Sequence, residues 1–171
     1  MPCALTQGYS INCRDSAGGI KSVYFIEFDN VSGFTESAGT VTAIAKANNA
    51  RFWKYNLQRA TGNWEEAYND SAENGTSFNV QTLSIVLNKM QAATSQEIKL
   101  LAQNRLIAVV EDKTGKYWML GDEHGLMRSG GKAGSGTAMG DRNGYELTFT
   151  TDNADPAPEV TSGIIAGLII P

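Results

Sequence analysis

Residues Trp64–Met90 (WEEAYNDSAENGTSFNVQTLSIVLNKM) place two strand-like segments on either side of an Asn-Gly pair, and this stretch decides the fold. The pair, Asn74-Gly75, lies within Glu73-Asn74-Gly75-Thr76. Asn-Gly between such segments is the strongest short-range hairpin signal, because a two-residue type I′ turn needs positive φ at both central positions. The stretch therefore predicts a long β-hairpin.

The apolar side of the second hairpin arm changes partway along it. Phe78 and Val80 occupy even positions, whereas Leu83, Ile85 and Leu87 occupy odd positions. Such a change indicates either a β-bulge or a strand whose outer half is buried against something other than its inner half. In a self-assembling protein, that second surface would belong to a neighbouring copy.

Strand signals recur on both sides of the hairpin. Alternation of apolar and polar residues, or a short apolar run between turn residues, is typical of strands. Phe52 departs from the alternation, because it falls on the polar side of its segment. The predicted strands are Ile20–Phe28, Val41–Ala45, Arg51–Arg59 with Trp53, Tyr55 and Leu57 on one face, Leu106–Asp112, Tyr117–Leu120 and Tyr145–Phe149.

One helix is expected, together with one glycine-rich loop. Thr94-Ser95-Gln96-Glu97 has the pattern of a capping box. After it, Ile98, Leu101, Ala102 and Arg105 follow the spacing of an amphipathic helix. The segment Gly130–Gly140 has almost nothing apolar to bury and predicts a mobile loop.

These elements predict a mainly β fold: an antiparallel β-sandwich or barrel with one flanking α-helix, a long protruding hairpin and a C-terminal extension. The 171 residues fit one domain, 1–171, with an N-terminal arm at 1–19 and the extension at 151–171. The apolar tail Ile164–Ile170 is too short to span a membrane. We expect it to add a strand or to pack on a neighbour.

Composition argues against several classes of function. The formal net charge is −4, which disfavours tight binding to nucleic acid phosphates. Met1–Ile11 lacks the pattern of a secretory signal, which favours a cytoplasmic origin. Cys3 and Cys13 are the only cysteines and cannot form an ordinary zinc site. A cytoplasmic origin favours free thiols, although their spacing also allows a disulfide.

No catalytic pattern emerges from the residues, so we expect neither an enzyme nor a cofactor nor a metal. The glycine-rich segment lacks the lysine-hydroxyl ending of a phosphate-binding loop. His124 is the only histidine, and no nucleophile accompanies it. Glu65 and Glu66 are neighbours on a strand and would point to opposite faces, so they cannot flank one bond.

Three further stretches are informative together: Asn74-Gly75-Thr76 leading into Leu83–Lys89, then Leu100–Leu106, and Gly140–Phe149. Together they resemble the major tail tube proteins of tailed bacteriophages. The resemblance spans most of Cys3–Val160 and implies hexameric rings stacked into a hollow virion tail, assembled in the bacterial cytoplasm. It implies as partners other copies of the chain, other tail proteins and genomic DNA that passes through without tight binding.

The contacts between subunits are expected on the hairpin and the C-terminal tail, because an exposed aromatic hairpin and an exposed apolar tail are hard to explain in a monomer. The alternatives are a tail terminator, a head-tail connector, a decoration protein, or a carbohydrate- or host-binding module that uses exposed aromatics. The predicted interface residues are Trp64, Tyr68, Asn74, Gly75, Phe78, Val80, Ile164, Ile165 and Leu168.

Overall fold

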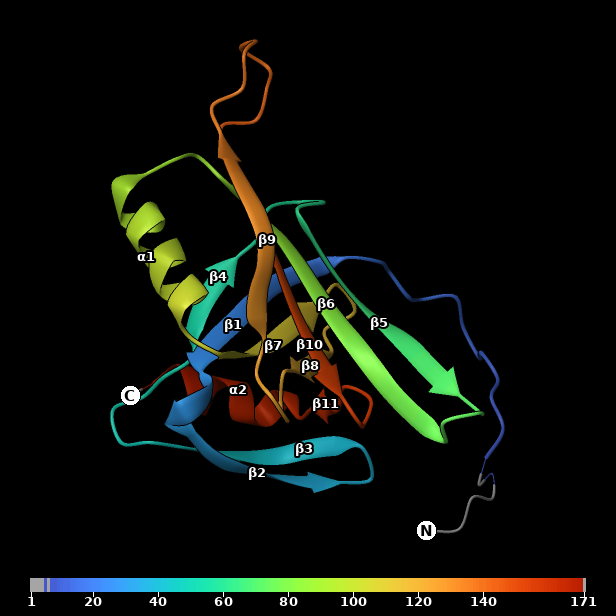
Figure 1. Cartoon of the computed structure of the whole chain (residues 1–171). Helices are drawn as coiled ribbons and strands as arrows, with labels where there is room; N and C mark the ends of the chain where they lie inside the picture. Colours follow the sequence, from blue (N-terminus) through green and yellow to red (C-terminus); the bar gives the residue numbers. More distant parts are fainter. Residues whose placement is uncertain (1–4, 6, 171) are drawn as a thin grey trace.

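The computed structural model describes residue 5 and residues 7–170, and within them two β-sheets pack face to face (Figure 1). The predicted mainly β, sandwich-like fold is confirmed. Sheet A has the order β2-β3-β11-β8-β7-β1-β4, and sheet B has the order β5-β6-β10-β9. The strands are β1 (Ile20–Glu27), β2 (Val31–Ser37), β3 (Thr40–Lys46), β4 (Trp53–Asn56), β5 (Gly62–Ser71), β6 (Thr76–Asn88), β7 (Leu106–Asp112), β8 (Tyr117–Leu120), β9 (Met127–Gly134), β10 (Gly144–Asn153) and β11 (Glu159–Val160).

The main core lies between the two sheets. Odd-numbered side chains of β6 and β10 meet the inner face of sheet A, as strand alternation requires. Helix α1 (Ala92–Gln103) covers one side of this core with Ile98 and Leu101. Of the other two residues in the predicted spacing, Ala102 is partly buried, and Arg105 lies beyond the helix end and is exposed. Fully buried members include Val23, Phe25, Leu83, Ile85, Val110 and Phe149.

A second core lies on the other face of sheet A, under helix α2 (Ser162–Ile169). Strands β1 and β7 are therefore buried on both faces, which explains their continuous apolar runs. Phe52, the residue that departed from strand alternation, is 1% exposed in this second core. Neither of the helices in the described part of the chain is long and apolar enough to cross a membrane.

The C-terminal tail corrects two expectations. Within the tail, Glu159–Val160 joins sheet A as β11. The described residues contain two helices, α1 and α2, whereas the sequence predicted a single helix. Ile165 and Leu168 are 6% and 5% exposed in the chain's own second core, and Ile164 is partly buried beside them. These side chains are thus covered by their own sheet, and β10 extends to Asn153, past the expected start of the extension at 151.

The Asn-Gly hairpin is confirmed as β5 and β6, although its turn differs from the prediction. Ser71 pairs with Thr76, so the loop has four residues, Ala72–Gly75. Of the loop residues, all of which are described, Gly75 alone has positive φ, at 63°. The prediction of a two-residue type I′ turn is therefore wrong.

The predicted bulge in β6 is also wrong. The pairing of β6 with β5 and with β10 runs without a shift in register. Odd positions face inward along the whole strand, and two of them, Asn79 and Gln81, are buried polar residues. Phe78 and Val80 lie on the outer face of sheet B, so the alternative explanation, a second partner for that face, remains a prediction.

The element that protrudes is the loop between β9 and β10, and the Asn-Gly hairpin forms half of sheet B instead (Figure 1). Residues 127–134 form β9, which corrects the predicted mobile loop for Gly130–Gly134. Backbone pairing needs no side chain, so an apolar pattern could not have indicated this strand. In the loop, Asp141 Oδ2 accepts from the backbone N–H groups of Thr137 and Ala138 at 2.9 and 2.8 Å.

Helix α1 starts two residues before the predicted capping box. Gln91 is its N-cap residue. The Gln91 side chain does not accept a hydrogen bond from a backbone amide of the first turn. Thr94 and Glu97 lie inside the helix and line a groove. The Tyr145 hydroxyl instead accepts from the Gln91 N–H at 3.3 Å, so a neighbouring strand satisfies one backbone N–H at this helix end.

Candidate self-assembly surface

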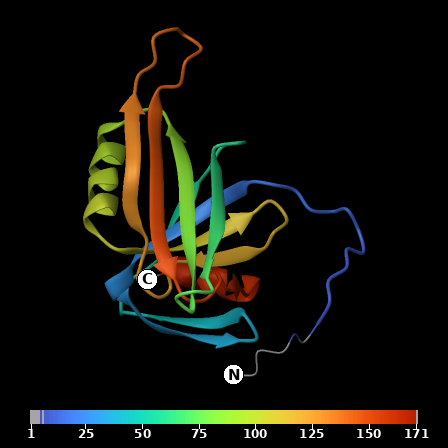
Figure 2. The same cartoon turned by 45° about the vertical axis from the view of Figure 1, so that its right-hand side comes forward.

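Among the residues that the structure describes, nothing covers the two edges or the outer face of sheet B. Within residues 7–170, β5 pairs only with β6, and β9 pairs only with β10. Figure 2 shows the four strands side by side, with no other element in front of them. Every residue of β9 is exposed. Natural proteins normally cover or block such edges, because bare backbone groups invite another strand to pair.

The two edges run in opposite directions. Each neighbouring pair in sheet B is antiparallel, so β5 and β9 are antiparallel to each other across the sheet. If β9 of one copy lies beside β5 of another, the antiparallel alternation continues unbroken. Sheet B can therefore be extended at both edges by copies of itself.

The two edge strands also carry opposite charge. Strand β5 has the acids Glu65, Glu66 and Asp70 and no base. Strand β9 has the bases Arg128 and Lys132 and no acid. Lys132 contacts Glu146 at 3.2 Å, but its side chain is 76% exposed and this surface pair contributes little. Opposite charge on adjoining strands favours the correct pairing and opposes like-with-like pairing.

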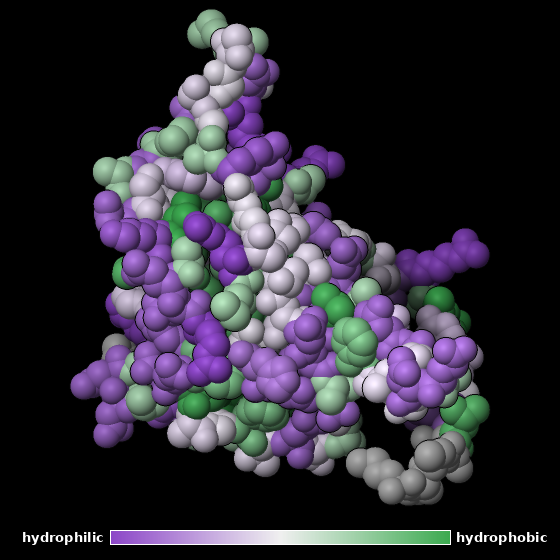
Figure 3. Space-filling model, in the orientation of Figure 1, coloured by the Kyte–Doolittle hydropathy of each residue, from purple (hydrophilic) through white to green (hydrophobic). Residues whose placement is uncertain are grey.

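The outer face of sheet B is weakly polar. Even positions of β6 and β10 point outward, and the β6 row from Thr76 to Asn88 contains no charged residue. In Figure 3 a pale band of near-neutral hydropathy runs down the front of the molecule over β9. The strands place Glu65, Glu146, Asp152 and Lys132 on this face, and Arg142 from the loop before β10 pairs with Glu146 at 2.6 Å, which leaves a small excess of acids.

Most of the predicted interface residues gather on the hairpin. Trp64 faces inward and packs against Trp118, with ring centroids 5.8 Å apart, whereas Tyr68 on the same strand is 67% exposed. Phe78 is 41% exposed on the outer face. The residues on β5, β6 and their loop are Trp64, Tyr68, Asn74, Gly75, Phe78 and Val80. The other three, Ile164, Ile165 and Leu168, belong to α2 and pack in or against the second core.

Sequence reasoning missed a buried polar cluster at one end of the sandwich. Gln81, fully buried, donates to Glu66 Oε1 at 3.2 Å and accepts from the Gly121 N–H at 3.0 Å. Nearby, Asn153 donates to Asp122, and burial raises the pKa of Asp122 to about 6. The odd positions of β6 could have indicated this cluster, because they continue the inner row from Leu83.

Replacing Asp122 with Asn is expected to flatten the dependence of stability on pH. The folded state holds the Asp122 proton more tightly than the unfolded state, so the contribution of Asp122 to the free energy of unfolding is fully present below pH 3.8 and is lost as the pH rises through about 6. This shift is worth at most about 3 kcal/mol, reduced by solvent screening to roughly 1 kcal/mol. Urea denaturation from pH 4 to 7 measures it. An unchanged slope in the variant would remove Asp122 as the cause.

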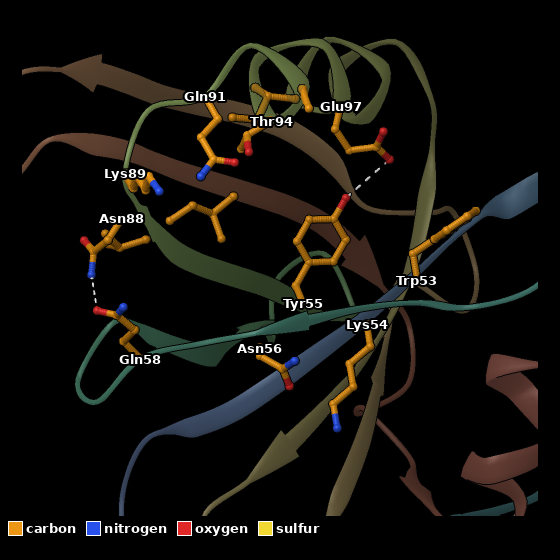
Figure 4. Close-up of a pocket in the computed structure, with 14 residues that line it drawn as sticks. Trp53, Lys54, Tyr55, Asn56, Gln58, Asn88, Lys89, Gln91, Thr94 and Glu97 are labelled. Atoms are coloured by element: carbon orange, nitrogen blue, oxygen red, sulfur yellow. Dashed lines mark hydrogen bonds between the residues drawn. The ribbon is translucent and has the colours of Figure 1, made fainter.

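A groove of about 550 Å³ lies between β4, the end of β6 and the start of α1 (Figure 4). Tyr55 points across it and donates to Glu97 at 3.4 Å. Burial and the Glu97 carboxylate raise the pKa of Tyr55, so its hydroxyl stays protonated. Trp53, 47% exposed at one end, lies under the Arg51 guanidinium at 3.8 Å.

The candidate chemical groups do not converge. Among residue 5 and residues 7–170, no group of three or more His, Cys, Asp or Glu side chains could hold a metal ion. His124 is exposed in the turn after β8. Glu65 and Glu66 point to opposite faces of β5, as predicted. Cys13 is exposed and forms no disulfide within the described residues. Cys3 lies outside them, so free thiols and a disulfide both stay predictions.

None of three comparisons with known proteins found a match. The chain matches no protein-family model, no curated protein and no solved structure. The free, oppositely charged edges of sheet B are therefore the strongest indication of function.

Proposed function

We propose that this chain is a structural protein that assembles with copies of itself through the edges of sheet B. Strand β5 of one copy pairs with β9 of the next. The observation that carries the proposal is the pair of free, antiparallel and oppositely charged edges on one sheet. Because the two joining surfaces differ, the contact is head-to-tail, and its repetition forms a closed ring or a helix.

The side chains at the β5 edge support this pairing. Trp64 and Tyr68 face the inner side of sheet B at its margin, and Tyr68 is largely uncovered. A neighbouring β9 continues the sheet beside them and shields them from water. The added ladder of backbone hydrogen bonds supplies affinity, as in other cases of strand addition.

A closed ring places the outer face of sheet B toward a central channel, because the inner face is occupied by sheet A. Six copies, the number that the phage resemblance implies, would contribute roughly 24 strands and a backbone circle about 48 Å across, at about 4.8 Å spacing and about 40° tilt. Barrels of 16–18 strands already leave an aqueous channel.

The charge of the channel face suits a conduit for DNA. Its acids Glu65, Glu146 and Asp152 outnumber the bases Lys132 and Arg142, both of which pair with Glu146, so the face keeps a small excess of negative charge and offers no free cluster of bases to phosphates. We therefore propose a tail tube protein of a bacteriophage virion, whose stacked rings conduct genomic DNA without tight binding.

Negative-stain electron microscopy and sedimentation of the purified protein test this function. Rings that stack into hollow tubes as the concentration rises are the expected result. A single closed ring at every concentration favours a tail terminator, connector or decoration protein. A protein that remains monomeric at high concentration contradicts assembly through sheet B.

A further inference from the structure

The N-terminal arm has no partner within the described part of its own chain. Residues 7–18 form no helix or strand, and every described residue of the arm up to Gly19 is exposed. Leu5 is 100%, Tyr9 88% and Ile11 67% exposed. Three large apolar side chains on one extended segment are costly to leave in water and indicate a missing contact.

The pattern of the arm is that of a half-buried strand. Leu5, Tyr9, Ile11 and Cys13 occupy odd positions, interrupted only by Gln7, and the even positions between them are Thr, Gly, Ser and Asn. Alternation of this kind presents one apolar face to a surface. No charged residue interrupts it before Arg14.

The groove beside β4 offers such a segment a backbone edge and an apolar floor. Within residues 7–170, β4 pairs only with β1, so its other edge is free. Tyr55, Leu87 and Ile98 line the groove, and Figure 4 shows Lys54 and Asn56 pointing away from it. A strand added along β4 can therefore place alternate side chains between β4 and α1.

The arm and the groove lie toward opposite sides of one molecule. In Figures 1 and 2 the arm leaves on the side of β5, and α1 lies on the side of β9. The start of β1 also lies close to the start of β5, because a Cβ built on Gly62 would come within 2.7 Å of the Ile20 side chain. Residues of α1 and β9 line one common hollow. When β5 of one copy joins β9 of the next, the arm of the first copy faces α1 of the second.

We infer that the N-terminal arm of one copy docks as an additional strand on β4 of the neighbouring copy, with Tyr9 and Ile11 in the groove beneath α1. This inference rests on the proposed pairing of β5 with β9. The arm covers the junction between copies. Its apolar side chains become buried in the groove, and its backbone forms hydrogen bonds with the free edge of β4.

Cross-linking between two kinds of copy tests the inference, with Cys3→Ser in every chain. The donor copy keeps Cys13, and the acceptor copy carries Cys13→Ser together with Thr94→Cys, which lines the groove. The matched control acceptor carries Gln96→Cys on the exposed side of α1 instead. With a short bismaleimide, the groove acceptor should yield about tenfold more donor-acceptor product than the control, because docking raises the effective concentration of Cys13. Adding Tyr9→Ser and Ile11→Ser to the donor should abolish that excess.

The outcomes separate the inference from the proposed function. Equal yields from the two acceptors, in protein that still forms rings, overturn arm docking and leave the ring intact. A further variant that keeps Cys13 and also carries Thr94→Cys in the same chain tests the alternative. A link that forms only within that single chain also overturns the inference, because the arm then fills its own groove. Protein that neither forms rings nor cross-links overturns the pairing of β5 with β9 as well.

Discussion

Reversing the charge of both basic side chains of β9, with Arg128→Glu and Lys132→Glu, is expected to leave a folded monomer that no longer assembles. Both residues are exposed, so the isolated fold loses little. In the assembly they would face the acidic strand β5 of the neighbour, and two attractive pairs become repulsive. That change is worth about 2 kcal/mol per contact, or roughly thirtyfold in each association constant. Sedimentation equilibrium measures the loss.

The reciprocal change provides the control. A variant with Glu65→Lys and Asp70→Lys on β5 should also fail to assemble with itself. A mixture of the β5 variant and the β9 variant should restore one contact, in which the now basic β5 of one variant pairs with the now acidic β9 of the other. Circular dichroism and urea denaturation of each variant establish that the monomer is intact. If the β9 variant assembles as strongly as the parent at low salt, β9 does not adjoin β5 in the assembly.

Removing residues 162–171 is expected to destroy the fold of the monomer itself. Helix α2 covers the outer face of sheet A, where Ile165 and Leu168 join the second core with Phe52. Leu168 also accepts a backbone hydrogen bond from Phe52 at 2.9 Å. Truncating a buried Leu or Ile to Ala typically costs about 2–5 kcal/mol, and losing the whole helix would exceed the stability of many domains of this size.

Single substitutions make this test quantitative. Ile165→Ala and Leu168→Ala should each lower the free energy of unfolding by about 2–4 kcal/mol, whereas Ile170→Ala, at a side chain 63% exposed, should change it by less than about 0.5 kcal/mol. Thermal and urea denaturation provide the measurement. A truncated chain that unfolds at the same urea concentration as the full chain would show that α2 does not stabilise sheet A.

Alternation and turn residues were enough to determine the strands with a clear apolar face. The hairpin of β5 and β6, the buried strand β7 and the alternating strand β10 were all predicted, because each residue's side of a strand is set by its position alone. The burial of Ile98 and Leu101 on α1 followed from helical spacing for the same reason. Of the candidate surface, Trp64 and Tyr68 were found as aromatics on a strand.

Only the tertiary structure decided which edges and faces remain open. Strand β9 is held by backbone pairing to β10, so its glycines carried no apolar signal, and its charge complements that of β5 from a distant part of the sequence. The C-terminal tail, which was expected to contact a neighbour, packs on sheet A of its own chain as α2. It does so because β1 and β7 present a second apolar face that needs to be covered. A local pattern shows that a side chain needs burial, whereas the partner that buries it depends on segments far apart in the chain, which only folding brings together.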